Sequence, residues 1–145
     1  MEINDITKEI IGAAIEVHKI LGPGLLEKPY ELCLIHELKL RGLKCESQKP
    51  VSIQYKGLVL DDSLKLDLVV ENKVIVELKA TKEILPVHRA QIMSYMKLSS
   101  INNGLIINFH VKLLKDGIER FIHPEQLSSS PMPSALTQKK MITIG

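Results

Sequence analysis

The chain has few aromatic residues and few cysteines. Its 145 residues include three tyrosines, two phenylalanines and no tryptophan, so few rings are available on which the bases of RNA or of a DNA single strand could stack. The two cysteines, Cys33 and Cys45, form no CxxC pair. A cysteine-ligated zinc site or an iron–sulfur cluster would therefore lack ligands, and we expect both thiols to be reduced and partly buried.

Long apolar runs and a strong excess of one charge are also missing. No apolar run approaches the roughly 20 residues of a membrane-spanning helix, and residues 1–5 lack the basic-then-apolar pattern of a signal peptide. We therefore expect a cytoplasmic protein without a membrane partner. The net charge of +2 identifies no partner, because phosphate binding depends on local clusters of Lys and Arg. The sequence leaves open whether the chain forms a homo-oligomer.

Length and composition fit one globular domain. A hydrophobic content of 45% and a charged content of 25% are ordinary for such a domain. Periodic apolar residues and turn residues predict three helices and several strands: helices near 5–21, 26–41 and 86–98, strands near 44–55, 58–61, 103–109 and 117–123, and a hairpin over 64–79. This order predicts an α/β fold with helices around a mixed central sheet. We expect one domain over residues 1–125 and a loop or disordered tail over 126–145.

The predicted hairpin carries most of the functional information. Its apolar strands surround the turn Glu71-Asn72-Lys73, and an antiparallel hairpin closed by that turn places Asp67 opposite Glu77. Side chains alternate between the faces of a strand, so Glu77 and Lys79 share one face. Facing carboxylates repel each other, and Mg²⁺, which takes one or two carboxylates with waters and phosphate oxygens, would relieve that repulsion. The alternative, an edge hairpin with a solvated charged face, is not excluded by spacing.

The second predicted helix contains a further carboxylate. Tyr30, Leu34 and Leu38 define its inward stripe, and Glu27 extends this stripe by one turn. A carboxylate on an apolar stripe needs a partner, because burying it unpaired is costly. The alternative is that Glu27 helps to cap the helix, since the macrodipole favours a negative charge at a helix N-terminus.

Gly24, Glu27 and Tyr30 form a GxxExxY pattern, and from about Ile6 to Phe121 the chain resembles the GxxExxY family of small prokaryotic proteins. The other matching segments are Ala14–His18, Leu21–Gly24, Glu77–Lys79, Pro86–His88, Gln91–Tyr95 and Ile107–Phe109. That family resembles the RecB-like branch of the PD-(D/E)XK nuclease superfamily, which implies a restriction-endonuclease-like core. One departure is that Lys65 and Leu66 stand where many members have an arginine and a small residue.

The resemblance also implies a set of site residues. The superfamily motif, a helix Glu, an Asp, a Glu-x-Lys and a Gln-x3-Tyr, falls on Glu27, Asp67, Glu77 with Lys79, and Gln91 with Tyr95. Together with the hairpin geometry, this implies a Mg²⁺ or Mn²⁺ ion bound by Glu27, Asp67, Glu77 and the backbone carbonyl of Leu78. Asp67, Glu77 and Lys79 are then the expected catalytic residues. The residues expected to position the substrate are Gln91, Tyr95 and His18.

The function implied by the resemblance is a metal-dependent nuclease that hydrolyses phosphodiester bonds, with nucleic acid, DNA in the first place, as its partner. The alternative is a non-catalytic nucleic-acid-binding or assembly module that retains the fold. The intact acidic positions and Lys79 favour the enzyme, because a binding protein has no need for carboxylates that repel phosphate. The small size of the chain and its modest charge favour the module.

Overall fold

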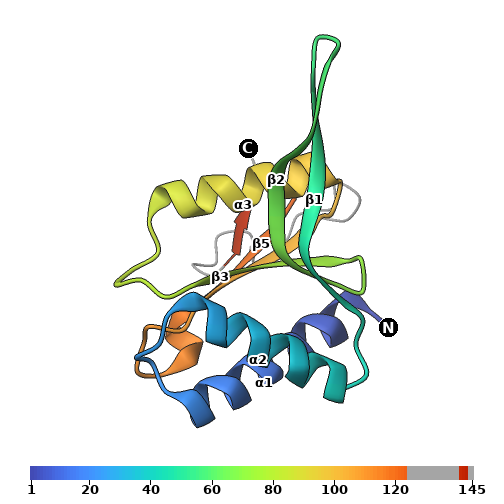
Figure 1. Cartoon of the computed structure of the whole chain (residues 1–145). Coiled ribbons are helices and arrows are strands. Elements are labelled where there is room, and N and C mark those ends of the chain that lie inside the picture. The colour runs from blue at the N-terminus through green and yellow to red at the C-terminus, as the bar shows by residue number, and fades with distance from the viewer. Residues whose placement is uncertain (124–140, 144–145) are drawn as a thin grey trace.

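A computed structural model describes residues 1–123 and 141–143 and shows three layers (Figure 1). Helices α1 and α2 cover one face of a mixed sheet, and α3 covers the other. The helices are α1 (Ile3–Leu21), α2 (Glu27–Leu40), α3 (Pro86–Ser99) and the short 3-10 helix η1 (Leu114–Gly117). The strands are β1 (Cys45–Tyr55), β2 (Leu58–Val70), β3 (Val74–Lys79), β4 (Asn103–Asn108), β5 (Ile118–Ile122) and β6 (Met141–Thr143). The predicted fold class is confirmed.

The six strands follow chain order across the sheet. β1, β2 and β3 form an antiparallel meander, β3 and β4 are parallel, β4 and β5 are antiparallel, and β5 and β6 are parallel. Parallel neighbours need a crossover connection, and α3 supplies it between β3 and β4. β3 therefore lies in the interior of the sheet, and α3 passes over the face on which Glu77 and Lys79 were predicted to lie.

Two strands differ from the sequence prediction. β2 continues through residues 61–63, where an interruption was predicted, because this part of the hairpin is exposed and its polar side chains stay in water. Met141–Thr143 forms β6 against β5, within the stretch predicted to be loop or disordered. Three residues are too few for periodicity to indicate a strand. The other residues of that predicted tail, 126–140 and 144–145, lie outside the described residues.

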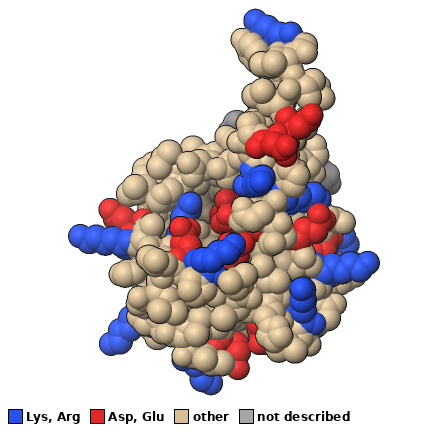
Figure 2. Space-filling view, in the orientation of Figure 1, with Lys and Arg blue, Asp and Glu red and all other residues tan. Residues whose placement is uncertain are grey.

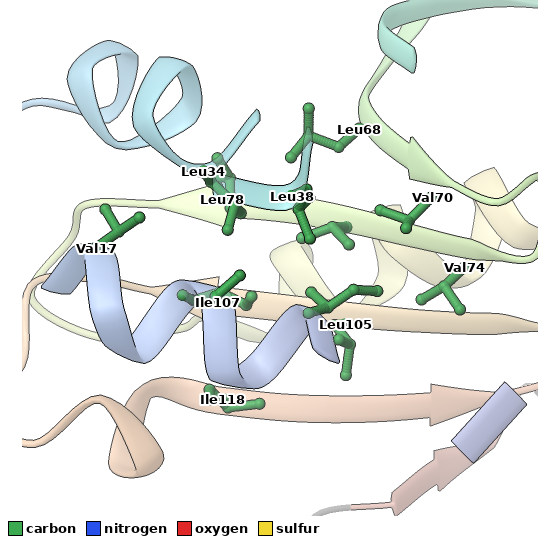
Figure 3. Packing of buried hydrophobic residues seen from close by; sticks show 14 of the residues in the cluster. Val17, Leu34, Leu38, Leu68, Val70, Val74, Leu78, Leu105, Ile107 and Ile118 are labelled. Atoms are coloured by element: carbon green, nitrogen blue, oxygen red, sulfur yellow. The ribbon is translucent and has the colours of Figure 1, made fainter. Parts of the chain in front are cut away.

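The larger of the two cores lies between the sheet and the α1–α2 pair. Figure 3 shows Val17 of α1 and Leu34 and Leu38 of α2 packed with Leu78 and Ile107 of the sheet. Burying each such aliphatic side chain stabilises the fold by about 1.5–3 kcal/mol. This packing fixes α2 against β3, and it thereby fixes how far the first turn of α2 lies from the predicted catalytic strand.

The outer part of the β1–β2 hairpin, residues 52–64, projects beyond the sheet, and we call it the arm (Figure 1). Next to the arm, the alternation of β2 side chains between the two faces of the sheet is interrupted. Leu68 packs in the core under α1 and α2, whereas Leu66 packs in the core under α3. Residues two apart on a regular strand share a face, so the strand twists sharply at Asp67, which lies between them.

Tyr30 ties the first turn of α2 to the turn before it. Its hydroxyl donates a hydrogen bond to the carbonyl of Gly22 and accepts one, 3.0 Å long, from the N–H of Leu25. Its ring stacks on Phe109 with centroids 4.3 Å apart. Gly22 has φ +76°, a backbone conformation that favours glycine. The tyrosine thus sets the direction from which α2, with Glu27 at its start, reaches the sheet.

Tyr30→Phe should lower the free energy of unfolding by about 1–3 kcal/mol. It leaves the stacked ring in place but removes both hydrogen bonds, so that the Gly22 carbonyl and the Leu25 N–H lose their partner. Thermal or urea unfolding measures this effect. Tyr55→Phe is the matched control, because Tyr55 is exposed on the arm and its hydroxyl has no such role. Equal stability of the two variants would contradict the role given to Tyr30.

Candidate metal-dependent catalytic site

Asp67 and Glu77 lie side by side where β2 and β3 separate. The two strands pair in register from Val70 and Val74 to Leu68 and Val76. At the next position, two hydrogen bonds from backbone N–H groups to side-chain carboxylates replace the backbone-to-backbone hydrogen bonds of the sheet. The N–H of Asp67 donates to Oε2 of Glu77 at 2.9 Å, and the N–H of Leu78 donates to Oδ2 of Asp67 at 3.0 Å. The register is the predicted one, and each strand supplies the carboxylate that satisfies the backbone of the other.

The Glu77 carboxylate is held in an environment that disfavours its charge. Glu77 is only 7% exposed. Burial, followed by the negative charge of Asp67, raises its pKa to about 8, although the hydrogen bond from the Asp67 N–H and the charge of Lys79 act in the opposite direction. In the absence of a cation, this glutamate is largely neutral at pH 7. A buried glutamate next to a second carboxylate is expected where a protein binds a cation.

The pKa of Asp67 is also raised, by causes that partly oppose one another. Burial is the largest cause that raises its pKa, and the charge of Glu31 adds to it. The N–H of Leu78, the charge of Lys79 and a hydrogen bond from the Gln48 side chain favour its ionised form. Two adjacent acids with raised pKa values therefore share one cationic neighbour, Lys79, within the described residues.

Glu27 reaches this cluster from the start of α2. The residue is exposed, but partial burial of its carboxylate and the negative charge of Asp67 raise its pKa, against the effect of Lys79. Glu27 is thus close enough to sense both Asp67 and Lys79.

Acidic and basic side chains lie intermixed on the face of the molecule below the arm (Figure 2).

Helix α3 brings two further groups to the cluster. Burial, followed by the charges of Glu77 and Asp67, raises the pKa of Tyr95. Burial and the nearby charges of Lys79 and Arg89 lower the pKa of His88. The His88 ring accepts a hydrogen bond at Nδ1 from the N–H of Leu85, so the neutral ring carries its proton on Nε2. The sequence motif includes no role for His88.

The other two residues expected to position the substrate occupy different surroundings. Gln91 lies one turn before Tyr95 on α3; its side chain is exposed and forms no hydrogen bond with the part of the chain that the structure describes. Nε2 of His18 lies 2.8 Å from the carbonyl oxygen of Val111. That contact joins the end of α1 to the loop after β4, and none of the described contacts joins His18 to Asp67 or Glu77.

Two neighbours of the cluster are not among the residues predicted from the sequence. Glu31 is buried at 7% exposure, one turn after the exposed Glu27, and Nε2 of Gln48 donates to its Oε2 at 3.1 Å. Gln48 occupies the β1 position opposite Asp67 and has φ +51°, a conformation that costs a non-glycine residue on the order of 1–2 kcal/mol. Gln48 thus links the buried Glu31 to Asp67. Helical spacing from Glu27 was the available signal for Glu31. No signal in the sequence indicated Gln48, because the pairing of β1 with β2 shifts register between Val51 and Ile53.

The oxygen donors fit a hard divalent cation. Among the described residues, no three His, Cys, Asp or Glu side chains come together closely enough to enclose a metal by themselves. Mg²⁺ needs only one or two protein carboxylates, because it keeps waters and takes substrate phosphate oxygens. The second oxygen of Glu77, Oε1, has no hydrogen-bond partner among the described residues. Asp67 and Glu77 therefore match the chemistry of such a site, whereas a closed protein cage is not formed.

Residues 4–121 match the PD-(D/E)XK nuclease superfamily. The chain belongs to this superfamily. Its nucleases generally use divalent metal ions, in agreement with the paired carboxylates and the lysine two residues further along β3. A crystal structure of a protein called SSO0001 is similar over 80% of this chain and 58% of that protein, with 21% sequence identity and a TM-score of 0.46. A search of curated proteins gave no match. None of the described helices could cross a membrane.

The metal-free protein should lose stability as the pH rises from about 4.5 to about 8. Glu77 binds its proton more tightly in the folded state, so the contribution of that proton is complete below the ordinary glutamate pKa of 4.5 and is lost as the pH passes about 8. Glu77→Gln stays neutral and keeps an acceptor for the Asp67 N–H, so its stability should depend less on pH. At pH 8 and above, the free energy of unfolding of the variant should exceed that of the wild type by up to a few kcal/mol.

Thermal unfolding in chelator over this pH range measures the difference. Glu83→Gln is the control, because Glu83 is exposed. Parallel pH profiles of the wild type and Glu77→Gln would contradict the electrostatic account of the site.

Proposed function

We propose that this chain is a divalent-metal-dependent nuclease that hydrolyses phosphodiester bonds in DNA. The observation that carries the proposal is the interlocked pair Asp67 and Glu77 with Lys79 on the same strand. Membership of the superfamily supports a nuclease. The GxxExxY pattern at Gly24–Tyr30 supports placing the chain in the GxxExxY family, on the RecB-like branch.

The proposed cation ligands are Asp67, Glu77, the backbone carbonyl of Leu78 and, from α2, Glu27. The N–H and C=O groups of one residue point to the same edge of a strand. Because the Leu78 N–H bonds to Asp67, the Leu78 carbonyl is directed into the same gap between β2 and β3. Bound Mg²⁺ or Mn²⁺ would supply Lewis acidity toward the scissile phosphate and lower the pKa of a water molecule.

The side chains divide the remaining work among them. Lys79 is a cation two residues beyond Glu77, where it can orient the attacking water and offset negative charge that develops on the phosphate. Tyr95, which senses the charges of Glu77 and Asp67, and Gln91, one turn before it, are proposed to hold the substrate backbone. His18 is proposed to act further away, through the loop that contains Val111.

A binding module that retains the fold is the second candidate. The observation that favours it is the exposed position of Glu27, which leaves two carboxylates rather than three at the centre of the described site. Metal-dependent turnover separates the two functions. Linear duplex DNA, circular single-stranded DNA and RNA are incubated with Mg²⁺ or Mn²⁺, each against a chelator. Cleavage in metal alone supports the nuclease, and binding without cleavage of any substrate supports the module.

Asp67→Asn should abolish the stabilisation of the protein by Mg²⁺ or Mn²⁺. Asparagine keeps an acceptor for the Leu78 N–H, so the fold is preserved, but it removes the negative charge that binds the cation. Melting temperatures with and without metal measure the shift. Asp62→Asn on the arm is the control and should keep the wild-type shift. Equal metal-induced shifts in both variants would place the ion elsewhere.

Lys79→Ala should retain or increase metal affinity, because a nearby positive charge is removed while the carboxylates remain. Cleavage should nevertheless fall by roughly 10²–10³-fold, as when one preorganised electrostatic group is removed from an active site. Cleavage of labelled DNA at saturating metal measures this loss. Lys82→Ala is the control, since Lys82 is exposed three residues further along the chain. Unchanged cleavage by Lys79→Ala would remove Lys79 from the chemistry.

A further inference from the structure

A cleft of about 590 Å³ lies between β1, at the base of the arm, and the C-terminal end of α3. Its volume falls in the range of about 300–1,000 Å³ that is typical of small-molecule and cofactor sites. Lys49 and Lys97 contribute positive charge, and no acidic side chain is among the described residues that line the cleft. Its other polar groups are Ser52, Gln54 and Ser99.

The floor of the cleft is aliphatic. Val51, Leu66, Leu98 and Ile101 line it. Leu66 is fully buried and Val51 nearly so, and Leu98, 41% exposed, and the half-buried Ile101 therefore offer the apolar surface that a ligand can contact. An apolar surface of this kind can cover the face of a base, whereas ammonium groups beside it can bind the phosphate. The cleft therefore has the chemistry of a nucleotide site in a chain that has few aromatic rings for stacking.

Two elements, β2 and α3, carry both lining residues of the cleft and residues of the carboxylate cluster. Leu66 on its floor directly precedes Asp67. On the opposite wall, Ser99 follows Tyr95 by one turn of α3, and its hydroxyl donates to the Tyr95 carbonyl at 2.7 Å. Four residues of helix span about 6 Å. A strand with one phosphate at Asp67 and Glu77 would thus place a neighbouring nucleotide in the cleft.

We infer that this cleft binds an unpaired nucleotide of the nucleic acid, next to the phosphodiester that is cut. The inference rests on the proposed function for its place along the strand and adds the class of substrate. A base reaches an aliphatic floor only when it is free of its pairing partner, so the substrate is a single strand or a single-stranded end. Tyr55 at the end of the arm, 62% exposed with Lys56 over its ring, gives the same strand a stacking surface beyond the cleft.

The charges around the cleft determine where the phosphate lies. Ser52 donates a hydrogen bond to Asp61 of the arm at 3.3 Å, which makes that side unfavourable for an anion. Lys49 is partly engaged, with its Nζ 3.4 Å from Glu46 and 3.3 Å from Asn72. Lys97 is exposed and forms no ion pair with a described residue. The phosphate is therefore assigned to the α3 side of the cleft, next to Lys97.

The test is fluorescence anisotropy of labelled oligonucleotides in chelator, so that binding is measured without cleavage. The wild type should bind a single strand more tightly than a duplex of the same sequence. Lys97→Glu should weaken single-strand binding by about tenfold and lower the slope of log affinity against log salt by about one. Lys8→Glu is the matched control, because it makes the same change in charge on an exposed position of α1 and should bind as the wild type does.

A second variant tests the floor without changing the charge. Leu98→Ser removes an exposed aliphatic side chain from the lining of the cleft, and it should weaken single-strand binding while leaving metal-induced stabilisation unchanged. Equal binding by Lys97→Glu and Lys8→Glu, or a preference for duplex, would overturn the inference even if the wild type cuts DNA. Selective loss in Lys97→Glu, with no cleavage by the wild type in any metal, would support the cleft and reject the nuclease.

Discussion

The candidate site depends on the two crossed hydrogen bonds between β2 and β3. Where the strands part, the backbone N–H groups of Asp67 and Leu78 lose their ladder partners and take up the carboxylates of Glu77 and Asp67 instead. A buried N–H without a partner would cost about 1–3 kcal/mol, so each carboxylate is needed by the backbone opposite it. The two carboxylates that would bind a cation therefore also end the pairing of β2 with β3, because they occupy the N–H groups that a continued ladder would use.

This double use explains the unfavourable electrostatics of the metal-free state. A neutral side chain could satisfy the same N–H groups, yet the chain places ionisable acids there, adds Glu31 behind Asp67, and supplies Lys79 as the nearby cation. Without a metal, burial and then the charge of Asp67 favour a proton on Glu77 and raise its pKa to about 8. A site that keeps such repulsion retains a cost in stability that a purely structural hairpin would have no reason to carry.

The sequence predicted the central part of this arrangement because it was encoded locally. The turn at residues 71–73 fixes the register, so the apposition of Asp67 and Glu77 followed from strand pairing alone. Helical periodicity likewise predicted the buried stripe of Tyr30, Leu34 and Leu38. Periodicity also predicted Glu27 on that stripe, whereas Glu27, the first residue of α2, is exposed and Glu31, one turn further along, is buried. Whether the first turn of a helix is covered by the rest of the fold is decided by tertiary packing, which the periodicity of one helix does not reveal.

Gln48 and the cleft could not be predicted for a related reason. A positive φ at a glutamine inside a strand leaves no mark in the composition of β1, and the change of face between Leu66 and Leu68 contradicts the alternation from which strands are recognised. The arm leaves the sheet beyond this twist (Figure 1), and the cleft lies between β1 and α3. Asp67 stands at that twist, so the residue at the centre of the proposed chemistry is also the position from which the arm begins to leave the sheet. A nucleic-acid strand bound along the arm would therefore reach the carboxylates by following β2.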